Sequence, residues 1–355
     1  MAIIVSGGAG FIGSNFVLNW LSKSNEMLIN IDKLTYAGNL KNIKSILHNP
    51  NHIFIEACIG NEELIGDILN KYKPRAIINF AAETHVDRSI AGPKLFMETN
   101  IVSTFNFLNC AHIYWKNLDF NQQNTFRFLH ISTDEVYGSL AEFDLPFTEF
   151  SQYKPNSPYS ATKAASDHLV RSYYHTYGFP TLTTNCSNNY GPNQFPEKLI
   201  PLVITHALNG KSLPIYGDGL QVRDWLYVED HCDAISVVLE KAAPGEVFNI
   251  GGWNEKSNIE IVRIVCAILD ELSPNKNKIP YEKQITYVKD RPGHDRRYAI
   301  NATKIMSDLG WKPKETFESG IRKTILWYLN NQDWIHDIQS GNYMDWMQQN
   351  YSHRQ

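Results

Sequence analysis

The sequence predicts an α/β protein, with a Rossmann-like, doubly wound parallel sheet followed by a smaller, mixed α/β C-terminal domain. Two observations predict this fold. Nearly continuous apolar runs alternate with amphipathic segments through the first half of the chain, and the first run leads directly into a glycine-rich turn. Apolar runs without polar alternation are typical of strands buried on both faces. We therefore expect a parallel sheet covered by helices on both sides.

Six strands and four helices are expected in this half. The strands are predicted at residues 3–6, 27–31, 53–57, 76–80, 126–132 and 181–186. The helices are predicted at residues 12–22, 62–72, about 94–115 and about 160–178. The two long helices could pack against a second subunit, so a homodimer is expected.

The pattern becomes irregular after about residue 186, with Gly/Pro turns at 190–192, 216–219, 251–252 and 291–293. We predict an N-terminal domain over residues 1–186 and a ligand-binding domain over residues 187–355. Segments 227–241 and 247–250 are expected to return to the first sheet. Residues 331–355 carry no signal of function.

Composition excludes several classes of protein. With 355 residues, 43% hydrophobic content and a net charge of -4, the chain lacks the basic surplus of nucleic-acid-binding proteins. No run is apolar enough to cross a bilayer or to act as a signal peptide, so a cytoplasmic location is expected. The five cysteines are scattered and never form Cys-x-x-Cys, which favours reduced thiols and no metal site.

The glycine-rich turn lies at residues 7–13, between the first strand and the first helix. Gly7, Gly10 and Gly13 would let the backbone turn tightly and approach a pyrophosphate at the helix N-terminus. Asp32 closes the second strand, 19 residues after Gly13, where a carboxylate can accept hydrogen bonds from an adenosine ribose. This favours NAD over NADP. Alternatively Asp32 caps the next segment, and Lys33 could tolerate a 2′-phosphate.

Tyr159 and Lys163 lie four residues apart, on one face of a predicted helix. A cation beside a phenol favours the phenolate, so Lys163 is expected to lower the pKa of Tyr159 and make it a usable base. The spacing is weak evidence by itself. Its position after the fifth predicted strand, downstream of a nucleotide loop, strengthens it.

Thr133, Asp134 and Glu135 follow the fifth strand, at the sheet edge where open α/β sheets bind their ligands. Two adjacent carboxylates suit a reaction that needs both an acid and a base. The competing interpretation is structural, because Ser132 with Glu135 also fits a capping box at a helix start.

Together these motifs resemble those of the dTDP-glucose 4,6-dehydratases, NAD-dependent members of the extended short-chain dehydrogenase/reductase superfamily. The resemblance runs to about residue 325, and its motifs are GGAGFIG at 7–13, DKLTYAGN at 32–39, AAETHVDRS at 81–89, STDEVYG at 132–138, YSATK at 159–163, SNNYGP at 187–192 and RDWLYVEDH at 223–231. It implies oxidation of a sugar at C4, loss of water across C5 and C6, and return of the hydride to C6, in deoxysugar (such as rhamnose) biosynthesis.

The resemblance also implies roles for individual residues. Catalysis is assigned to Thr133, Asp134, Glu135, Tyr159 and Lys163, with Asp134 protonated as the acid and Glu135 as the base. NAD contacts are implied at Gly7, Gly10, Phe11, Ile12, Gly13, Asp32, Lys33, Leu34, Thr35, Cys58, Ile59, Phe80, Ala81, Ala82, Thr84, Thr99, Tyr159, Lys163 and Asn189. Nucleotide-sugar contacts are implied at Thr84, Thr133, Asn188, Lys198, Leu199, Pro214, Ile215, Tyr216, Arg223, Asn258, Asp290, Arg291 and His294.

Three positions depart from the family pattern. Cys58 stands where the family usually carries an Asp that meets the adenine amino group, and a thiol is a weaker acceptor than a carboxylate. Weaker cofactor retention is therefore expected. Asn185 replaces an Arg and Asn301 replaces an Asp, and both are expected to lie outside the reaction centre.

Other activities on the same fold stay open. A sugar-nucleotide 4-epimerase or decarboxylase would share Tyr159 and Lys163 but would not need Asp134 and Glu135. GDP-mannose and UDP-glucose are alternative substrates, although EKLIP at 197–201 resembles the dTDP-glucose type. A non-catalytic NAD-binding sensor is a further alternative, because fold alone does not fix function.

Overall fold

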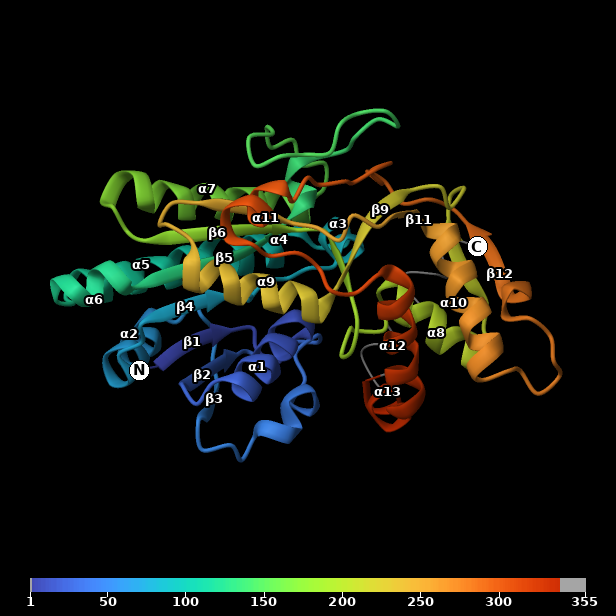
Figure 1. The fold of residues 1–355 in the computed structure, drawn as a ribbon, viewed down its shortest axis with the longest axis horizontal. Helices are drawn as coiled ribbons and strands as arrows, with labels where there is room; N and C mark the ends of the chain where they lie inside the picture. Colours follow the sequence, from blue (N-terminus) through green and yellow to red (C-terminus); the bar gives the residue numbers. More distant parts are fainter. Residues whose placement is uncertain (1, 339–355) are drawn as a thin grey trace.

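A seven-stranded parallel sheet forms the centre of the first half of the molecule in the computed structural model, which describes residues 2–338 (Figure 1). Its strands are β1 (Ala2–Ser6), β2 (Met27–Asp32), β3 (His52–Glu56), β4 (Ala76–Asn79), β5 (Arg127–Thr133), β6 (Thr181–Cys186) and β10 (Val247–Ile250). Their order is β10-β6-β5-β4-β1-β2-β3, so the order reverses beside β1. Ligands of open α/β sheets bind at such a reversal, outside the carboxyl ends of the strands.

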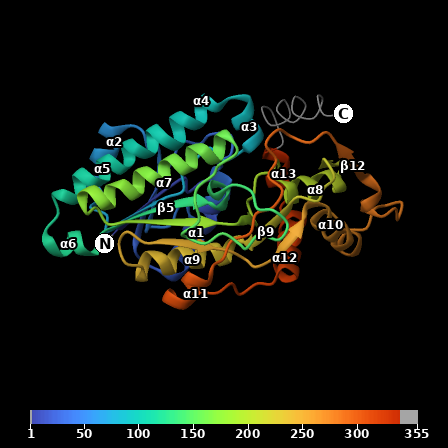
Figure 2. The ribbon, with the colours of Figure 1, turned by 90° about the horizontal axis from the view of Figure 1, so that it is seen from above.

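Helices cover both faces of this sheet (Figure 2). One face carries α1 (Phe11–Lys23) and α9 (Val228–Lys241), with α11 (Thr303–Leu309) beside β10. The other face carries α2 (Glu62–Tyr72), α5 (Thr104–Lys116) and α7 (Pro158–Tyr177). Shorter helical segments are η1 (Leu40–Ile46), α3 (Val86–Ala91), α4 (Pro93–Phe96), η2 (Met97–Ser103), α6 (Phe120–Thr125) and η3 (Asp134–Tyr137).

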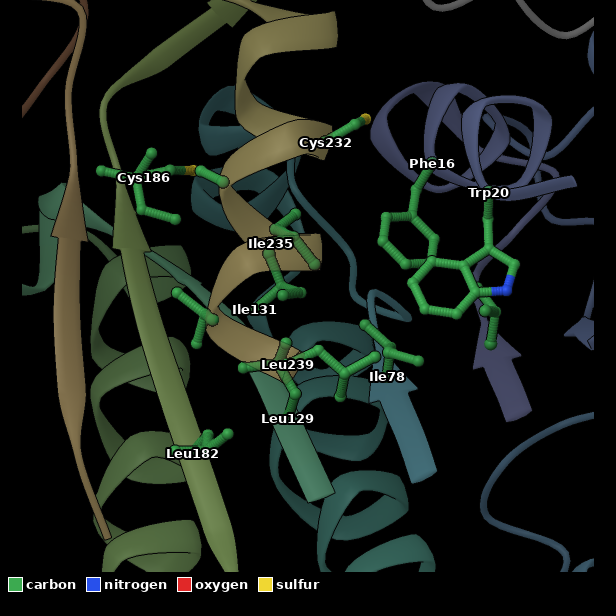
Figure 3. Close-up of a cluster of buried hydrophobic side chains, with 14 of the residues drawn as sticks. Phe16, Trp20, Ile78, Leu129, Ile131, Leu182, Cys186, Cys232, Ile235 and Leu239 are labelled. Atoms are coloured by element: carbon green, nitrogen blue, oxygen red, sulfur yellow. The ribbon is translucent and has the colours of Figure 1, made fainter. Parts of the chain in front are cut away.

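Each strand contributes to two cores because its side chains alternate between the faces of the sheet. Ile3 and Val5 of β1 pack in the core under α1 and α9, whereas Ile4 packs in the core under α2, α5 and α7. Figure 3 shows the first core, where Phe16 and Trp20 of α1 meet Ile78 and side chains of α9. Both faces are buried, which explains the apolar runs in the sequence.

The C-terminal part is smaller and mixed. Its strands are β7 (Asn188–Tyr190), β8 (Leu213–Tyr216), β9 (Val222–Tyr227), β11 (Glu255–Ser257) and β12 (Ile285–Val288), and its helical segments are α8 (Leu199–Leu208), α10 (Asn258–Leu272), η4 (Tyr281–Gln284), α12 (Phe317–Asn330) and α13 (Gln332–Ile338). The strands form a three-stranded sheet, β11-β9-β7, and a two-stranded sheet, β12-β8. Side chains of α8, α10, α12 and α13 form its core. No helix within residues 2–338 has the length and apolarity needed to span a membrane.

The prediction of a doubly wound α/β fold is confirmed. The six expected strands are present with ends shifted by a residue or so, and the segment 247–250 returns to the sheet by pairing with β6. The long helix expected near residues 94–115 is instead α4, a π-helical turn and α5 in succession. The domain boundary near residue 186 stays a prediction, and residues 339–355 of the predicted second domain lie outside the described residues.

Candidate active site

A cavity of about 520 Å³ lies at the carboxyl ends of β1, β2, β4, β5 and β6. It brings together every residue predicted to contact NAD except Leu34, and all five predicted catalytic residues. Leu34 does not line the cavity; its backbone N–H donates to Asp32 Oδ1 at 2.8 Å. The sequence motifs therefore converge on one site, although they are spread over more than 180 residues.

The glycine loop forms the floor of this cavity, and two of its glycines are required by close packing. Gly7 has a φ of +73°, and a Cβ there would lie 2.8 Å from the backbone nitrogen of Ala81. A Cβ on Gly13 would lie 2.2 Å from the carbonyl oxygen of Gly7. Helix α1 starts immediately after Gly10 without a side-chain cap, so its first N–H groups are available to an anion.

Asp32 lies at the end of β2, where it lines the cavity and also accepts hydrogen bonds from the nearby backbone. Its Oδ2 accepts from the N–H of Ala9 at 2.9 Å, and its Oδ1 accepts from that of Leu34. The capping role considered for Asp32 is therefore real, yet each carboxylate oxygen keeps a second lone pair for a ribose hydroxyl. The glycine loop and the N-terminus of α1 fit a pyrophosphate, and Asp32 fits a ribose with a free 2′-hydroxyl. Together they fit NAD.

Thr133, Asp134 and Glu135 form the turn after β5. Thr133 caps η3, because its Oγ1 accepts from the N–H of Glu135 at 3.3 Å. The alternative capping box of Ser132 and Glu135 is wrong, since the hydroxyl of Ser132 donates to Asp167 Oδ2 at 2.7 Å instead. Glu135 is therefore free of a capping role, and its carboxyl lines the cavity.

The two adjacent carboxyls differ in their surroundings. Burial, followed by the charges of Glu135 and Asp224, raises the pKa of Asp134 well above its ordinary value. Burial also raises the pKa of Glu135, but the cationic groups of Arg291, Arg223 and Lys198 oppose that rise. Asp134 therefore favours the protonated form more strongly, which is how paired carboxyls come to act as acid and base.

Tyr159 and Lys163 are positioned by the start of α7. Ser157 caps this helix in a capping box with Ser160, and Pro158 occupies the first turn. Lys163 donates from Nζ to the carbonyl oxygen of Ile131 at 2.8 Å. This anchors the ammonium against the end of β5, one helical turn from the phenol.

The sequence predicts a lowered pKa for Tyr159, and this is wrong: the groups of the protein raise it. Burial raises the pKa of Tyr159 well above its ordinary value, and the charge of Glu135 adds to the rise, whereas a hydrogen bond from Thr133 opposes it. The physical reason is that Tyr159 is only 7% exposed, and a charged phenolate loses its hydration there. A positive charge beside Tyr159 is therefore needed to stabilise its phenolate.

Asn100 is a site residue that sequence reasoning missed. It lies in the π-helical turn η2, and its side chain holds both backbone groups of Glu83: Oδ1 accepts from the N–H at 2.8 Å and Nδ2 donates to the carbonyl at 3.0 Å. The same Nδ2 lies 3.0 Å from the hydroxyl of Thr162 on α7. Asn100 thus connects the AAETH segment to the catalytic helix. Such π-turns are frequent at functional sites, but no residue pattern signals one.

A second cavity, of about 180 Å³, adjoins the first and shares Glu135, Asn188 and Lys198 with it. Its walls bring together most of the residues predicted to contact the nucleotide sugar: Asn188, Lys198, Leu199, Pro214, Ile215, Tyr216, Arg223, Asn258, Arg291 and His294. Thr84 and Thr133 line the larger cavity instead. Asp290 lines neither, and its Oδ1 lies 2.6 Å from Nδ1 of His294, so it orients that ring.

Of the three departures from the family pattern, Cys58 lines the larger cavity as a free thiol, and its contact with the adenine stays a prediction. Asn301 lies apart from both cavities, bonded to Phe147 and Thr303. Asn185 lines neither cavity, but it contacts the catalytic turn. It is buried in β6, and its Nδ2 donates to the carbonyl of catalytic-turn residue Thr133 at 3.2 Å.

Comparison with known proteins agrees with this geometry. A family model described as GDP-mannose 4,6 dehydratase matches residues 4–324. A dTDP-glucose 4,6-dehydratase from Xanthomonas campestris is 56% identical over 340 residues, covering 96% of each chain. The chain belongs to the dTDP-glucose 4,6-dehydratase family.

Two solved members of this family share the fold. A dTDP-glucose 4,6-dehydratase from Bacillus anthracis, solved in complex with NAD, has a TM-score of 0.84 at 47% identity, covering 95% of this chain and 99% of its own. One from Streptomyces venezuelae, with NAD and a further ligand bound, has a TM-score of 0.86 at 41% identity, covering 95% of this chain and 100% of its own.

Proposed function

We propose that this chain is an NAD-dependent dTDP-glucose 4,6-dehydratase, a hydro-lyase that converts dTDP-glucose into dTDP-4-keto-6-deoxyglucose and water. The observation that carries the proposal is the position of a differently tuned carboxyl pair, Asp134 and Glu135, in the same cavity as Tyr159 and Lys163. A reaction that only oxidised the sugar would need Tyr159 and Lys163 but not the two carboxyls. Full-length relatives of the same activity support the assignment of substrate.

The reaction begins at C4, because the C5 hydrogen of glucose is not acidic until C4 is a ketone. Tyr159 takes the proton of the C4 hydroxyl, and Thr133 hydrogen-bonds the same oxygen. Bound NAD accepts the hydride from C4 and later returns it to C6, so no net oxidation results. Lys163 contributes positive charge beside Tyr159, which the burial of the phenol makes necessary.

Water is lost in the second stage. Glu135 removes the proton from C5, which the C4 ketone has made acidic, and Asp134 donates a proton to the C6 hydroxyl as it leaves. The raised pKa of Asp134 keeps that proton in place at neutral pH. The proton removed and the proton donated balance, and one water is the product.

The smaller cavity suits the nucleotide diphosphate. Arg223, Arg291 and Lys198 offset its charge, and Asn188 and Asn258 offer amide hydrogen bonds. Tyr216 offers a flat face to the base, and its hydroxyl is tied to Asp87 Oδ2 at 3.2 Å. Asn188 Oδ1 is buried and has no hydrogen-bond partner within residues 2–338, which fits a site built for a polar ligand.

Direct assay tests this function. The purified protein is incubated separately with dTDP-glucose, UDP-glucose and GDP-mannose, and the ultraviolet absorbance of the 4-keto-6-deoxy product is recorded after alkali is added. We expect signal with dTDP-glucose and no lasting accumulation of NADH. Signal only with UDP-glucose or GDP-mannose would correct the substrate. Silence with all three, despite bound NAD, would favour an epimerase, a decarboxylase or a sensor.

We also propose that the chain forms a homodimer through the exposed face of η2 and α5. Val102, Phe105 and Ile113 recur at helical spacing and are 52%, 40% and 54% exposed, and Met97 one turn earlier is 53% exposed. The apolar stripe suits a second copy of itself. Light scattering should give a dimer for the wild type and a monomer for Val102→Glu with Ile113→Glu; a wild-type monomer would contradict the proposal. The cytoplasmic location and a role in deoxysugar synthesis stay predictions.

A further inference from the structure

A polar cluster lies beneath the reaction centre, and of its members the proposed reaction uses only Lys163. We call it the Asp167 cluster; it consists of His130, Ser132, Tyr153, Lys163, Asp167 and Asn185. Its side chains come from β5, β6, α7 and the segment before α7. Most are buried, and Asp167 is only 4% exposed. A buried carboxyl at this place requires an explanation.

Three donors converge on one oxygen of Asp167. Its Oδ2 accepts from the hydroxyl of Ser132 at 2.7 Å, from that of Tyr153 at 3.0 Å and from Nδ2 of Asn185 at 3.3 Å. Three donors on one oxygen are the surroundings that suit a carboxylate. The cluster therefore holds a negative charge in place.

That charge lies one helical turn from Lys163. Asp167 follows Lys163 by four residues in α7, so both project from the same helix face. Nε2 of His130 lies between them, 3.3 Å from Lys163 Nζ and 3.4 Å from Asp167 Oδ1. A buried ammonium without an opposite charge tends to lose its proton, and burial does lower the pKa of Lys163, whereas Asp167 opposes the change.

The other titratable groups that face Lys163 within the described chain do not supply this charge. His130 is neutral, because burial and Lys163 lower its pKa to about 4, and its Nδ1 lies 3.2 Å from the amide nitrogen of Asn79. Burial raises the pKa of the Cys186 thiol on β6 and of Tyr159, so both stay protonated. Tyr137 and Tyr153, which face Asp167, are likewise kept neutral by the raised pKa of each phenol.

We propose that Asp167 is a positioning residue for the reaction: it is the buried counter-ion that keeps Lys163 protonated beside Tyr159. The proposal rests on the roles of Tyr159 and Lys163 in the proposed function. If the charge on Lys163 is lost, proton removal by Tyr159 becomes harder, because burial and Glu135 already oppose the phenolate. Ser132, Tyr153 and Asn185 act through Asp167, because each donates a hydrogen bond to it. Asn185, one of the three departures from the family pattern, thus supports the carboxyl of Asp167.

The pH profile of kcat tests this role, because a merely structural residue would lower the rate without moving the profile. In Asp167→Asn the acidic limb of the plot of kcat against pH should shift to higher pH by about one unit or more. As a result, kcat at neutral pH should fall about 10-fold and recover at higher pH. KM should change little. Asp167→Glu keeps the charge and should return the limb toward its wild-type position.

Two tyrosine variants complete the design should Asp167→Asn fail to fold. Tyr153→Phe removes one donor to Asp167 and should move the limb in the same direction by a smaller amount. Tyr137→Phe is the matched control, because its hydroxyl bonds Asn249 at 2.8 Å rather than Asp167, and its limb should not move. An unmoved limb in Asp167→Asn, or in Tyr153→Phe if the first variant is unfolded, would overturn the proposal. A wild type without turnover would instead contradict the proposed function.

Discussion

Trp334 donates its indole N–H to Asn42 Oδ1 at 2.8 Å, although 292 positions separate the two residues. The same Asn42 amide donates from Nδ2 to the carbonyl oxygen of Ala9, in the glycine loop, at 2.8 Å. Helix α13, close to the end of the described chain, therefore braces the cofactor loop through a single buried side chain. We therefore expect this contact to affect NAD binding.

Trp334→Phe should weaken NAD binding by about 2- to 10-fold, because it keeps an aromatic ring in the core but removes one buried hydrogen bond. Calorimetric titration with NAD measures this. Trp311→Phe is the matched control: Trp311 is also buried, and its indole nitrogen has no hydrogen-bond partner among residues 2–338. Equal effects of the two substitutions would show that lost packing, rather than the Asn42 contact, is responsible.

Cys58→Asp should tighten NAD binding by about 3- to 10-fold, because a carboxylate is a much better acceptor for an adenine amino group than a thiol. Cys58 lines the larger cavity between Ala57 and Ile59, so the new carboxylate faces the ligand. Calorimetry again gives the affinity. Cys58→Leu, which is of similar size and has no acceptor, should give no gain. An affinity unchanged in Cys58→Asp would refute the interpretation of this departure.

Asp134→Asn should lower kcat by about 100-fold or more, because the amide cannot protonate the departing C6 hydroxyl. Oxidation at C4 does not need this proton, so NADH absorbance should build up after dTDP-glucose is added. Rapid-mixing absorbance measures the build-up. Tyr159→Phe is the contrasting variant: it removes the base of the first step and should show neither NADH nor product. NADH that fails to accumulate in Asp134→Asn would mean that Asp134 acts before or during oxidation.

The sequence was sufficient to predict the sheet and most of the site because each signal there is local. The apolar runs reflect strands buried on both faces, and Gly7 and Gly13 are fixed by contacts that exclude a Cβ. Asp134 and Glu135 follow a strand directly, so their place at the sheet edge follows from topology. The motifs converge because the carboxyl ends of parallel strands share one edge.

What the sequence could not predict depends on contacts between distant segments. Asn42 and Asn100 are ordinary polar residues until the fold places a tryptophan or a backbone beside them. The contacts of Asn185 could not be predicted because its partners, Thr133 and Asp167, lie on neighbouring elements. The pKa of Tyr159 was predicted in the wrong direction because burial, which dominates it, cannot be derived from the Tyr-Lys spacing.

The stability of Asp134→Asn relative to the wild type should increase with pH. Burial holds the pKa of Asp134 well above the 3.8 of an exposed Asp, so between those values the folded protein binds a proton that the unfolded chain does not. The wild type therefore loses stability as pH rises through this window, by up to about 1.4 kcal/mol for each pH unit crossed. Asn carries no titrating proton and escapes this loss.

Melting temperatures of the two proteins, measured by calorimetry from pH 5 to pH 8, test this coupling. The other buried groups are common to both proteins, so their contributions largely cancel in the difference. We expect the stability difference to shift in favour of Asp134→Asn as the pH rises from 5, for as long as the pH stays below the folded pKa of Asp134. A difference that stays constant across this range would mean that Asp134 is already ionised at pH 5 in the folded protein, and it could then not serve as the acid that protonates the C6 hydroxyl.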